Sequence, residues 1–204
     1  MLSRMFSYIY QQPLDKVIQF SIVIIIEWAI LMHLMKDHAK RSRTVNQCCT
    51  AAALLVILGA TILDRTIGSC SQVYLQPFSS FSAERFNAEL CRECMMNVFL
   101  FLPLGIFVPF TLPENKKDKV RYTVLFGLCL SMGAETLQLL FGLGWCETDD
   151  IINNTLGATL GTRAYVLFEK MPQLLNAFQR VKEPLFSLQK TILSDKNSET
   201  PHRF

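Results

Sequence analysis

The stretch CMMNVFLFLPLGIFVPFTLP, residues 94–113, decides the fold class, because its twenty residues lie between Glu93 and Glu114 and carry no charge. A helix that crosses the hydrocarbon core of a bilayer needs about 20 apolar residues. The stretch therefore predicts a transmembrane helix.

Four more apolar runs extend this prediction to the rest of the chain. Residues 44–63 form a second uncharged run of the same length. Each of the other three contains one or two acidic, basic or histidine residues: 17–35 contains Glu27 and His33, 122–146 contains Glu135, and 151–168 contains Arg163. The chain is 50% hydrophobic and only 18% charged, whereas roughly a quarter of an ordinary soluble domain is charged. A buried soluble helix explains any single run, but all of them together leave too little polar surface. We therefore predict an all-α polytopic membrane protein with about five transmembrane helices and an amphipathic C-terminal helix.

The basic residues predict the orientation, because Lys and Arg near the ends of spans are retained on the cytoplasmic side. They follow the first, third and fifth predicted spans: Lys36, Lys40, Arg41 and Arg43; Lys116, Lys117, Lys119 and Arg121; Lys170, Arg180, Lys182 and Lys190. We expect an external N-terminus, a cytoplasmic C-terminus and no cleaved signal peptide. The net charge of +3 is too small to indicate nucleic-acid binding.

Three regions are expected from this pattern. Residues 1–49 hold the N-terminal span and a basic cytoplasmic loop, and residues 50–169 form a membrane domain of four helices. Residues 170–204 form a cytoplasmic tail, with an amphipathic helix that Pro184 should bend and a disordered segment over the last ten residues.

Polar side chains inside predicted spans are candidate functional groups, because burying them in a membrane is costly unless they meet a partner or a ligand. Those near the predicted external ends of spans are expected to meet in one outer-leaflet site: Arg65, Asn97, Glu135, Gln138, Asp149, Asp150, Asn153 and Asn154. Glu135, Asp149 and Asp150 are the candidates for acid–base chemistry. We expect no cofactor and no metal, because none of the three His lies near these carboxylates.

Two further patterns concern packing and cysteine chemistry. Gly157 and Gly161 continue a row of i, i+4 positions that begins at Asp149 and Asn153, which predicts close helix packing. Asn153 and Asn154 also fit a simple role in helix packing. Cys91 and Cys94 leave a disulfide open as an alternative to packing, because they lie near an external span end.

Three segments carry a resemblance to a known family: NVFLFLPLG at 97–105, ETLQL at 135–139 and ETDDIINNTLGATLG at 147–161. The chain resembles the VanZ-like family of bacterial membrane proteins over roughly residues 52–165. Many members carry an arginine shortly before the acidic pair, where this chain has Gly144, Trp145 and Cys146. The resemblance implies a multi-pass protein of the bacterial cytoplasmic membrane, in a family whose founding members confer low-level resistance to the glycopeptide teicoplanin.

Three functions remain open at this point. The first is binding of an amphiphile, such as a lipid, a lipid-linked cell-wall precursor or a lipoglycopeptide, by the outer-leaflet site without catalysis. The second is an intramembrane hydrolase or transferase that uses the three carboxylates, and the third is a proton-coupled carrier that uses Glu135. Membrane lipids are the expected partners in each case, nucleic acid is not, and the sequence identifies no protein partner.

Overall fold

The computed structural model describes residues 14–35, 38–63, 65, 67–68, 70–82 and 87–198. Two compact units divide the chain, Met1–Tyr165 and Val166–Phe204. The predicted external N-terminus falls on residues 1–13, which lie outside the described residues.

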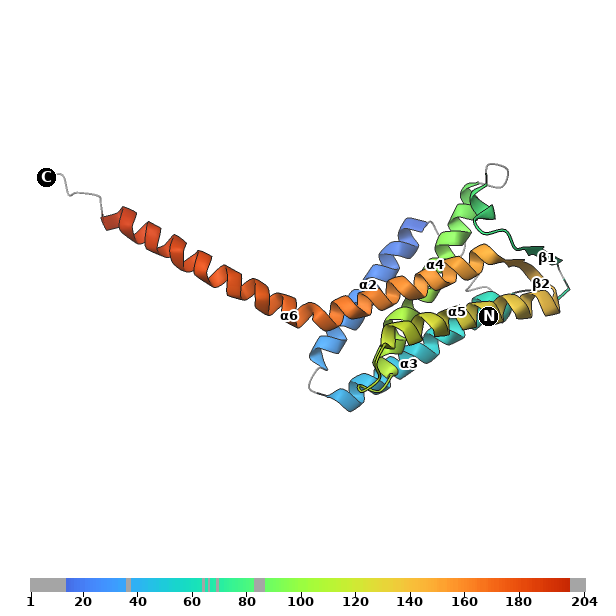
Figure 1. Cartoon of the computed structure of the whole chain (residues 1–204), viewed down its shortest axis with the longest axis horizontal. Coiled ribbons are helices and arrows are strands. Elements are labelled where there is room, and N and C mark those ends of the chain that lie inside the picture. Colours follow the sequence, from blue (N-terminus) through green and yellow to red (C-terminus); the bar gives the residue numbers. More distant parts are fainter. Residues whose placement is uncertain are drawn as a thin grey trace. The chain divides into compact units, whose positions relative to one another are not determined.

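Helices make up most of the structure, which confirms the all-α fold class (Figure 1). They are α2 (Leu14–Leu34), α3 (Ala39–Leu58) with a π-helical continuation (Gly59–Leu63), α4 (Ala88–Thr111), α5 (Lys119–Phe141) and α6 (Thr148–Ser198). Helix α6 begins in the first unit, and its remainder forms the described part of the second.

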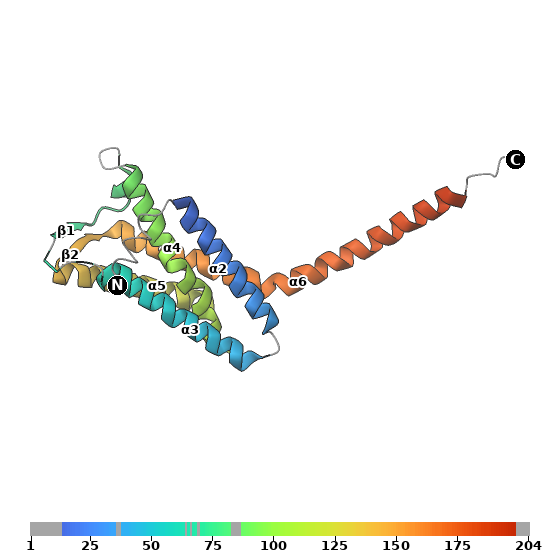
Figure 2. The same ribbon diagram turned by 180° about the vertical axis from the view of Figure 1, so that it is seen from behind.

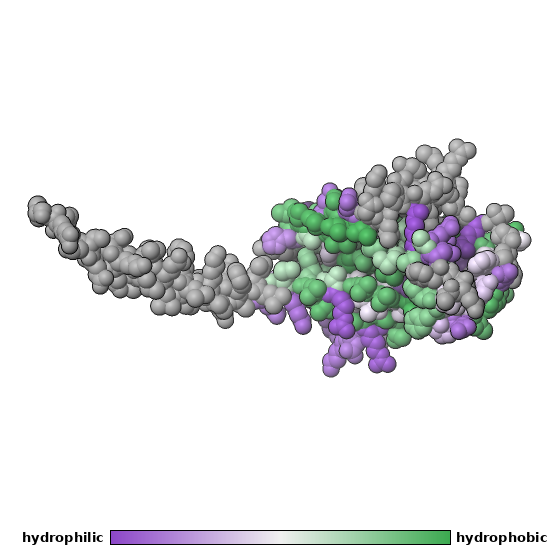
Figure 3. Space-filling view, turned by 90° about the horizontal axis from the view of Figure 1, so that it is seen from above, coloured by the Kyte–Doolittle hydropathy of each residue, from purple (hydrophilic) through white to green (hydrophobic). Residues whose placement is uncertain are grey.

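Among the described residues, three helical segments are long and apolar enough to cross a membrane: Lys40–Leu63, Ala88–Thr111 and Lys119–Phe141. A shorter apolar segment, Ser21–Leu34, lies within the first predicted span. Figure 3 shows hydrophobic residues spread over much of the visible surface of the helices, as expected for side chains that face lipid. The fifth predicted span lies in α6, which is not among the three segments, so the number of spans stays a prediction.

The predicted fourth span is too long at its C-terminal end. Helix α5 ends at Phe141, and Gly142 caps it in the left-handed conformation, with a φ of 62°. Residues Leu143–Glu147 then form strand β2, which pairs in parallel with β1 (Cys70–Tyr74). An apolar run has the same composition in a buried strand as in a helix, so hydropathy did not reveal this change of structure.

The C-terminal region also differs from the prediction. Helix α6 continues through Pro184 to Ser198, so residues 195–198, predicted to be disordered, are helical. Residues 199–204 lie outside the described residues.

Helix α4 contributes more residues to the buried core of the first unit than any other described helix does. Phe101, Leu104 and Val108 pack with Ile57 of α3 in a buried cluster. On another side of α4, Trp28 of α2 packs edge-to-face against Phe107, with ring centroids 5.5 Å apart. Figure 2 shows α2 beside α4 in this arrangement.

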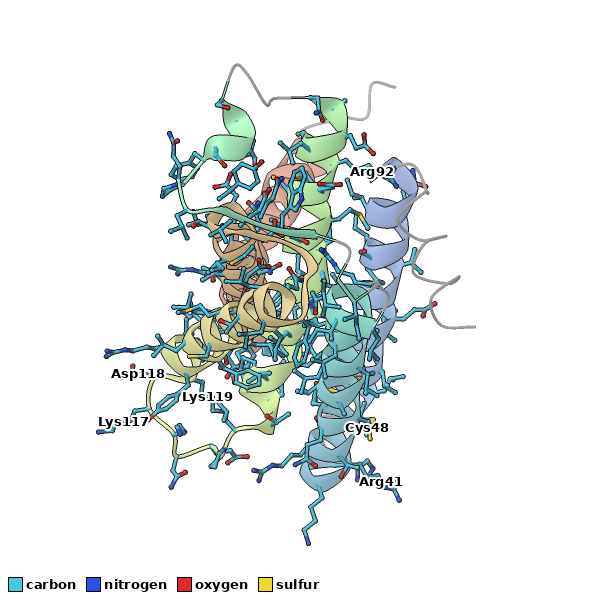
Figure 4. All side chains as sticks on the ribbon, turned by 90° about the vertical axis from the view of Figure 1, so that its right-hand side faces the viewer. Arg41, Cys48, Arg92, Lys117, Asp118 and Lys119 are labelled. Carbon is cyan, nitrogen blue, oxygen red and sulfur yellow. The ribbon has the colours of Figure 1, made fainter. Side chains whose placement is uncertain are left out.

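The two ends of the first unit differ in charge. Arg43 at the start of α3 donates a hydrogen bond to the carbonyl of Thr111, the last residue of α4, at 3.0 Å. This bond holds the basic start of α3 near the basic loop between α4 and α5. Figure 4 shows Arg41, Lys117 and Lys119 toward this end, and Arg92 toward the other. The strands and the acidic start of α6 lie at the end away from these basic segments, because β2 joins α5 to α6.

Candidate functional site

Helices α4 and α6 touch through their backbones, and this contact positions the site. A Cβ atom added to Gly157 would lie 2.2 Å from the carbonyl oxygen of Val98, and one on Gly161 would lie 2.1 Å from that of Leu102. On the facing helix, a Cβ on Gly105 would lie 2.2 Å from the carbonyl oxygen of Ala158. The helices can therefore approach this closely only because these positions lack side chains.

Asp150 and Asn97 connect the same two helices at the start of α6. The Asn97 amide donates a hydrogen bond of 2.7 Å to Oδ1 of Asp150. Burial raises the pKa of Asp150 to about 7, and the carboxylate of Glu147 adds to this effect. Arg65 and the bond from Asn97 offset part of the increase. Asp150 can therefore exchange a proton near neutral pH.

Glu135 lies inside the same group of charges. Its side chain is 3% exposed, and Oε2 accepts a hydrogen bond of 3.0 Å from the backbone N–H of Glu147. Asp150, Glu147 and Arg65 all act on it electrostatically. The structure therefore brings Glu135 and Asp150 into one cluster, in which Arg65 provides positive charge.

Three buried amide side chains on α5 and α6 lie about one helical turn from Glu135 or Asp150. Gln138 donates a hydrogen bond of 3.0 Å to the carbonyl of Thr61, and Asn154 donates one of 2.9 Å to Oγ of Ser131. Within the described part of the chain, one atom of each amide lacks a hydrogen-bond partner: Oε1 of Gln138, Nδ2 of Asn153 and Oδ1 of Asn154. Buried polar atoms are normally paired, so these three call for water or a ligand group.

Asp149 has a different environment from its neighbour Asp150. Its carboxylate accepts hydrogen bonds from the backbone N–H groups of Phe78, at 2.5 Å, and Ser80, at 2.7 Å, and from the Ser79 hydroxyl at 3.4 Å. Burial alone would raise the pKa of Asp149, but these bonds outweigh it and hold the pKa below its usual value. Asp149 therefore anchors the loop after β1, and a role in ligand binding stays a prediction.

Arg65 lies against the backbone of β2. A Cβ atom on Gly144 would lie 2.2 Å from Nη1 of Arg65, and Gly144 has a φ of 156°, which other residues rarely adopt. Gly144 thus leaves room for the guanidinium group beside the carboxylates. Arg65 was predicted to lie at the site, whereas nothing in the sequence indicated the part played by Gly144.

The described cysteine and acidic side chains can be checked for a disulfide and for a metal-binding arrangement. Cys91 and Cys94 are both free thiols, and Cys94 lies beside Ser80 and Asn153. Among the residues that the structure describes, no group of three or more His, Cys, Asp or Glu side chains is arranged to hold a metal ion.

The structure places the eight predicted site residues around the strand-bearing end of the first unit, but in different roles. Sequence reasoning did not assign Glu147, Ser131 and Thr61 to the site, although each contacts or faces a predicted residue. The acidic run at the start of α6 could have indicated Glu147. Ser131 and the Thr61 carbonyl gave no signal, because their positions depend on how helices pack.

Apolar helices and a buried polar cluster at their ends define an α-helical membrane protein. The model of the VanZ/LLP1 family matches residues 20–169, and the chain belongs to this family. Protein VanZ of Enterococcus faecium is 33% identical over 79 residues, which are 39% of this chain and 47% of that protein. The chain thus matches about half the length of this curated relative. No solved structure was found to match the chain.

Proposed function

We propose that this VanZ-like protein binds an amphiphile of the bacterial envelope at the polar cluster and thereby contributes to glycopeptide resistance. The amphiphile is a lipid, a lipid-linked cell-wall precursor or a lipoglycopeptide such as teicoplanin. The observation that carries the proposal is the set of unpaired buried amide atoms on Gln138, Asn153 and Asn154 beside the carboxylate cluster. A polar headgroup would supply the missing hydrogen bonds.

The charges at the cluster fit a headgroup that carries both signs. Asp150 and Glu135 suit an ammonium group or a hydroxyl donor, whereas Arg65 suits a phosphate or carboxylate. Leu139, the residue after Gln138 on α5, is an exposed apolar side chain that suits an acyl chain bound beside the polar groups. An amphiphile matches this combination better than a water-soluble ligand does.

The basic segments support an outer-leaflet position for the site. They gather at the opposite end of the first unit, where the hydrogen bond from Arg43 to Thr111 joins the start of α3 to the end of α4. Since basic loops are retained in the cytoplasm, the strand-bearing end faces outward in this proposal. Single-cysteine labelling of intact cells at Lys117 and Thr148 tests this orientation.

The proposal is tested by mass spectrometry of the lipids that copurify with the protein from its native membrane. One amphiphile should be enriched over its share of the bulk membrane. Gln138→Met, which removes the amide but keeps the side-chain length, should reduce this enrichment. Thr136→Ala is the matched control, because Thr136 lies on the exposed face of α5 and bonds only to its own helix in the contacts seen. A wild-type protein with lipids in bulk proportions would overturn the proposal.

A second candidate, an intramembrane hydrolase or transferase, is favoured by Asp150. Its pKa of about 7 suits a general acid or base at neutral pH. The same mass spectrometry distinguishes the two functions, because an enzyme would convert the enriched amphiphile into a product with an altered headgroup. Enrichment without a product supports binding alone.

A further inference from the structure

The segment around β1 is unusual for a loop outside a membrane, because no charged residue occurs between Arg65 and Glu84. Its large apolar side chains are exposed: Ile67 by 76%, Leu75 by 72% and Phe78 by 64%. Strand β2, which pairs with β1, and the end of α5 carry more exposed apolar side chains: Leu140, Phe141 and Trp145.

This segment is held firmly against the end of α5 and the start of α6. Gly68 donates a backbone hydrogen bond to Phe141, and β1 pairs with β2 along five residues. The Thr148 hydroxyl bonds to the carbonyl of Leu75 at 3.1 Å, and Asp149 holds the turn at Phe78. These hydrogen bonds therefore hold the apolar side chains in exposed positions and keep them from turning into the core. We call residues 67–68 and 70–82 together with β2 the β platform.

Neither water nor the hydrocarbon core suits the β platform. Exposed apolar clusters of this kind in water mark a surface that contacts another apolar phase. The sheet has two strands among the described residues, so backbone groups at its edges need hydrogen-bond partners that hydrocarbon lacks. The interfacial layer of a bilayer meets both needs, because it accepts apolar side chains and still contains water.

The connection to α5 sets the depth of the β platform. One residue, Gly142, separates the apolar segment Lys119–Phe141 from β2, so β2 starts where a membrane-spanning α5 leaves the hydrocarbon. The rings of Tyr74 and Trp145 pack together here, with centroids 5.5 Å apart. Tryptophan and tyrosine are enriched at this level of membrane proteins.

From these observations we propose that the β platform lies in the interfacial layer of the lipid bilayer, with its exposed apolar side chains inserted between lipids. The surface partner is thus the membrane itself. This inference does not depend on the proposed function, because it needs no ligand at the carboxylate cluster.

Tryptophan fluorescence tests the inference, because the chain contains only two tryptophans, Trp28 and Trp145. The Trp28→Phe protein, reconstituted into phosphatidylcholine vesicles, reports on Trp145 alone. Lipids brominated close to the headgroup should quench Trp145 at least about twofold more than lipids brominated at the chain ends, as expected for a residue in the interface. If Trp28→Phe does not fold, the difference between wild type and Trp145→Phe gives the same signal.

Two other occupants of the surface would give different results. Strong quenching by aqueous iodide without quenching by brominated lipid would place the β platform in water and overturn the inference. Protection from both quenchers would mean that protein covers the surface, either a second copy or another chain, and would also overturn it.

A charge substitution separates insertion from simple proximity to lipid. Leu75→Glu should reduce quenching by the shallow brominated lipid at least about twofold, because a carboxylate withdraws from the apolar side of the interface. Gln76→Glu is the matched control: it adds the same charge at the next residue, which is already polar and exposed. Equal quenching in Leu75→Glu and Gln76→Glu would contradict insertion of Leu75.

Discussion

The contact between α4 and α6 and the polar cluster at the start of α6 are two turns apart on the same helix, yet they are built differently. At Gly157 and Gly161 the backbones touch with no space for one more carbon atom. Near Asp150, buried amides keep atoms without partners among the described residues. The close backbone contact fixes where the helices lie, whereas the unpaired polar atoms are still able to form hydrogen bonds with a ligand. Substitutions in the first region should break the fold, and those in the second should change binding.

The largest effects are expected for substitutions of Gly161 and Gly157, of which Gly161→Ala is the smallest change. The added methyl group would meet the Leu102 carbonyl oxygen at 2.1 Å, and backbone on both helices cannot move aside cheaply. We expect a loss of about 3 kcal/mol or more, seen as reduced expression and a lower melting temperature in detergent. Gly157→Leu and Gly161→Leu should be worse still.

Gly133→Ala is the matched control for this prediction. Nothing lies within 4 Å of a Cβ at Gly133 on α5. Alanine favours helix over glycine by about 0.5–1 kcal/mol, so this variant should be as stable as wild type or more stable. Normal expression and melting of Gly161→Ala would remove the distinction between the two regions.

The packing region could be predicted in part from sequence. The spacing of Gly157 and Gly161 indicated a helix contact, because small residues at i, i+4 recur on one face. Their partners, Val98 and Leu102, could not be identified, since nothing in a helical sequence specifies which neighbouring backbone will fill a groove. The same limit hid the pairing of β1 with β2, which joins segments about seventy residues apart.

The second prediction concerns Asp149, which belongs to the fixed part of the molecule despite its charge. In Asp149→Asn, an NH₂ group replaces one carboxylate oxygen. This group faces the backbone N–H of Phe78 or of Ser80 and is unable to accept a hydrogen bond from it. We expect a loss of about 2 kcal/mol, because hydrogen bonds to a charged group contribute this much. The measurement is thermal melting in detergent, with Asp150→Asn as the control that changes the same charge at the next residue. Equal melting of the two variants would contradict the loop-anchoring role.

The different roles of these two aspartates could not be predicted from sequence. Both follow the same acidic residue at the start of one helix, and composition gives them equal weight. Successive residues of a helix point about 100° apart, so Asp149 reaches the loop after β1 while Asp150 reaches Asn97 on α4. Only the positions of those partners distinguish an anchor from a titrating group.

The third prediction tests Glu135 as a binding residue. Glu135→Gln keeps an oxygen that can accept the Glu147 N–H, so the protein should fold and retain the copurified amphiphile. Glu135→Ala should reduce the bound amphiphile about tenfold, which corresponds to the loss of one uncharged hydrogen bond. A folded Glu135→Gln protein that has lost an envelope phenotype would instead support proton transfer by this carboxylate.

The smallest effect is expected for the pH dependence of stability at Asp150. Burial and the Glu147 carboxylate raise its pKa from 3.8 to about 7 in the folded protein. The folded protein therefore binds the proton more tightly than the unfolded chain does. The stabilisation that follows is fully present below about pH 4 and is lost as the pH rises through about 7.

Asp150→Asn removes this titration while keeping an oxygen for the Asn97 amide. Wild type should lose stability between about pH 4 and pH 7 relative to the variant, by about 1 kcal/mol, since solvent screens a partly exposed carboxylate. Arg65 and Glu93 also act on Asp150, so Arg65→Gln should raise its pKa further and move the loss of wild-type stability to higher pH. Melting curves recorded at several pH values measure both changes. Parallel pH profiles for wild type and Asp150→Asn would show that Asp150 does not titrate in this range, and would remove the support that its pKa gives to the enzymatic alternative.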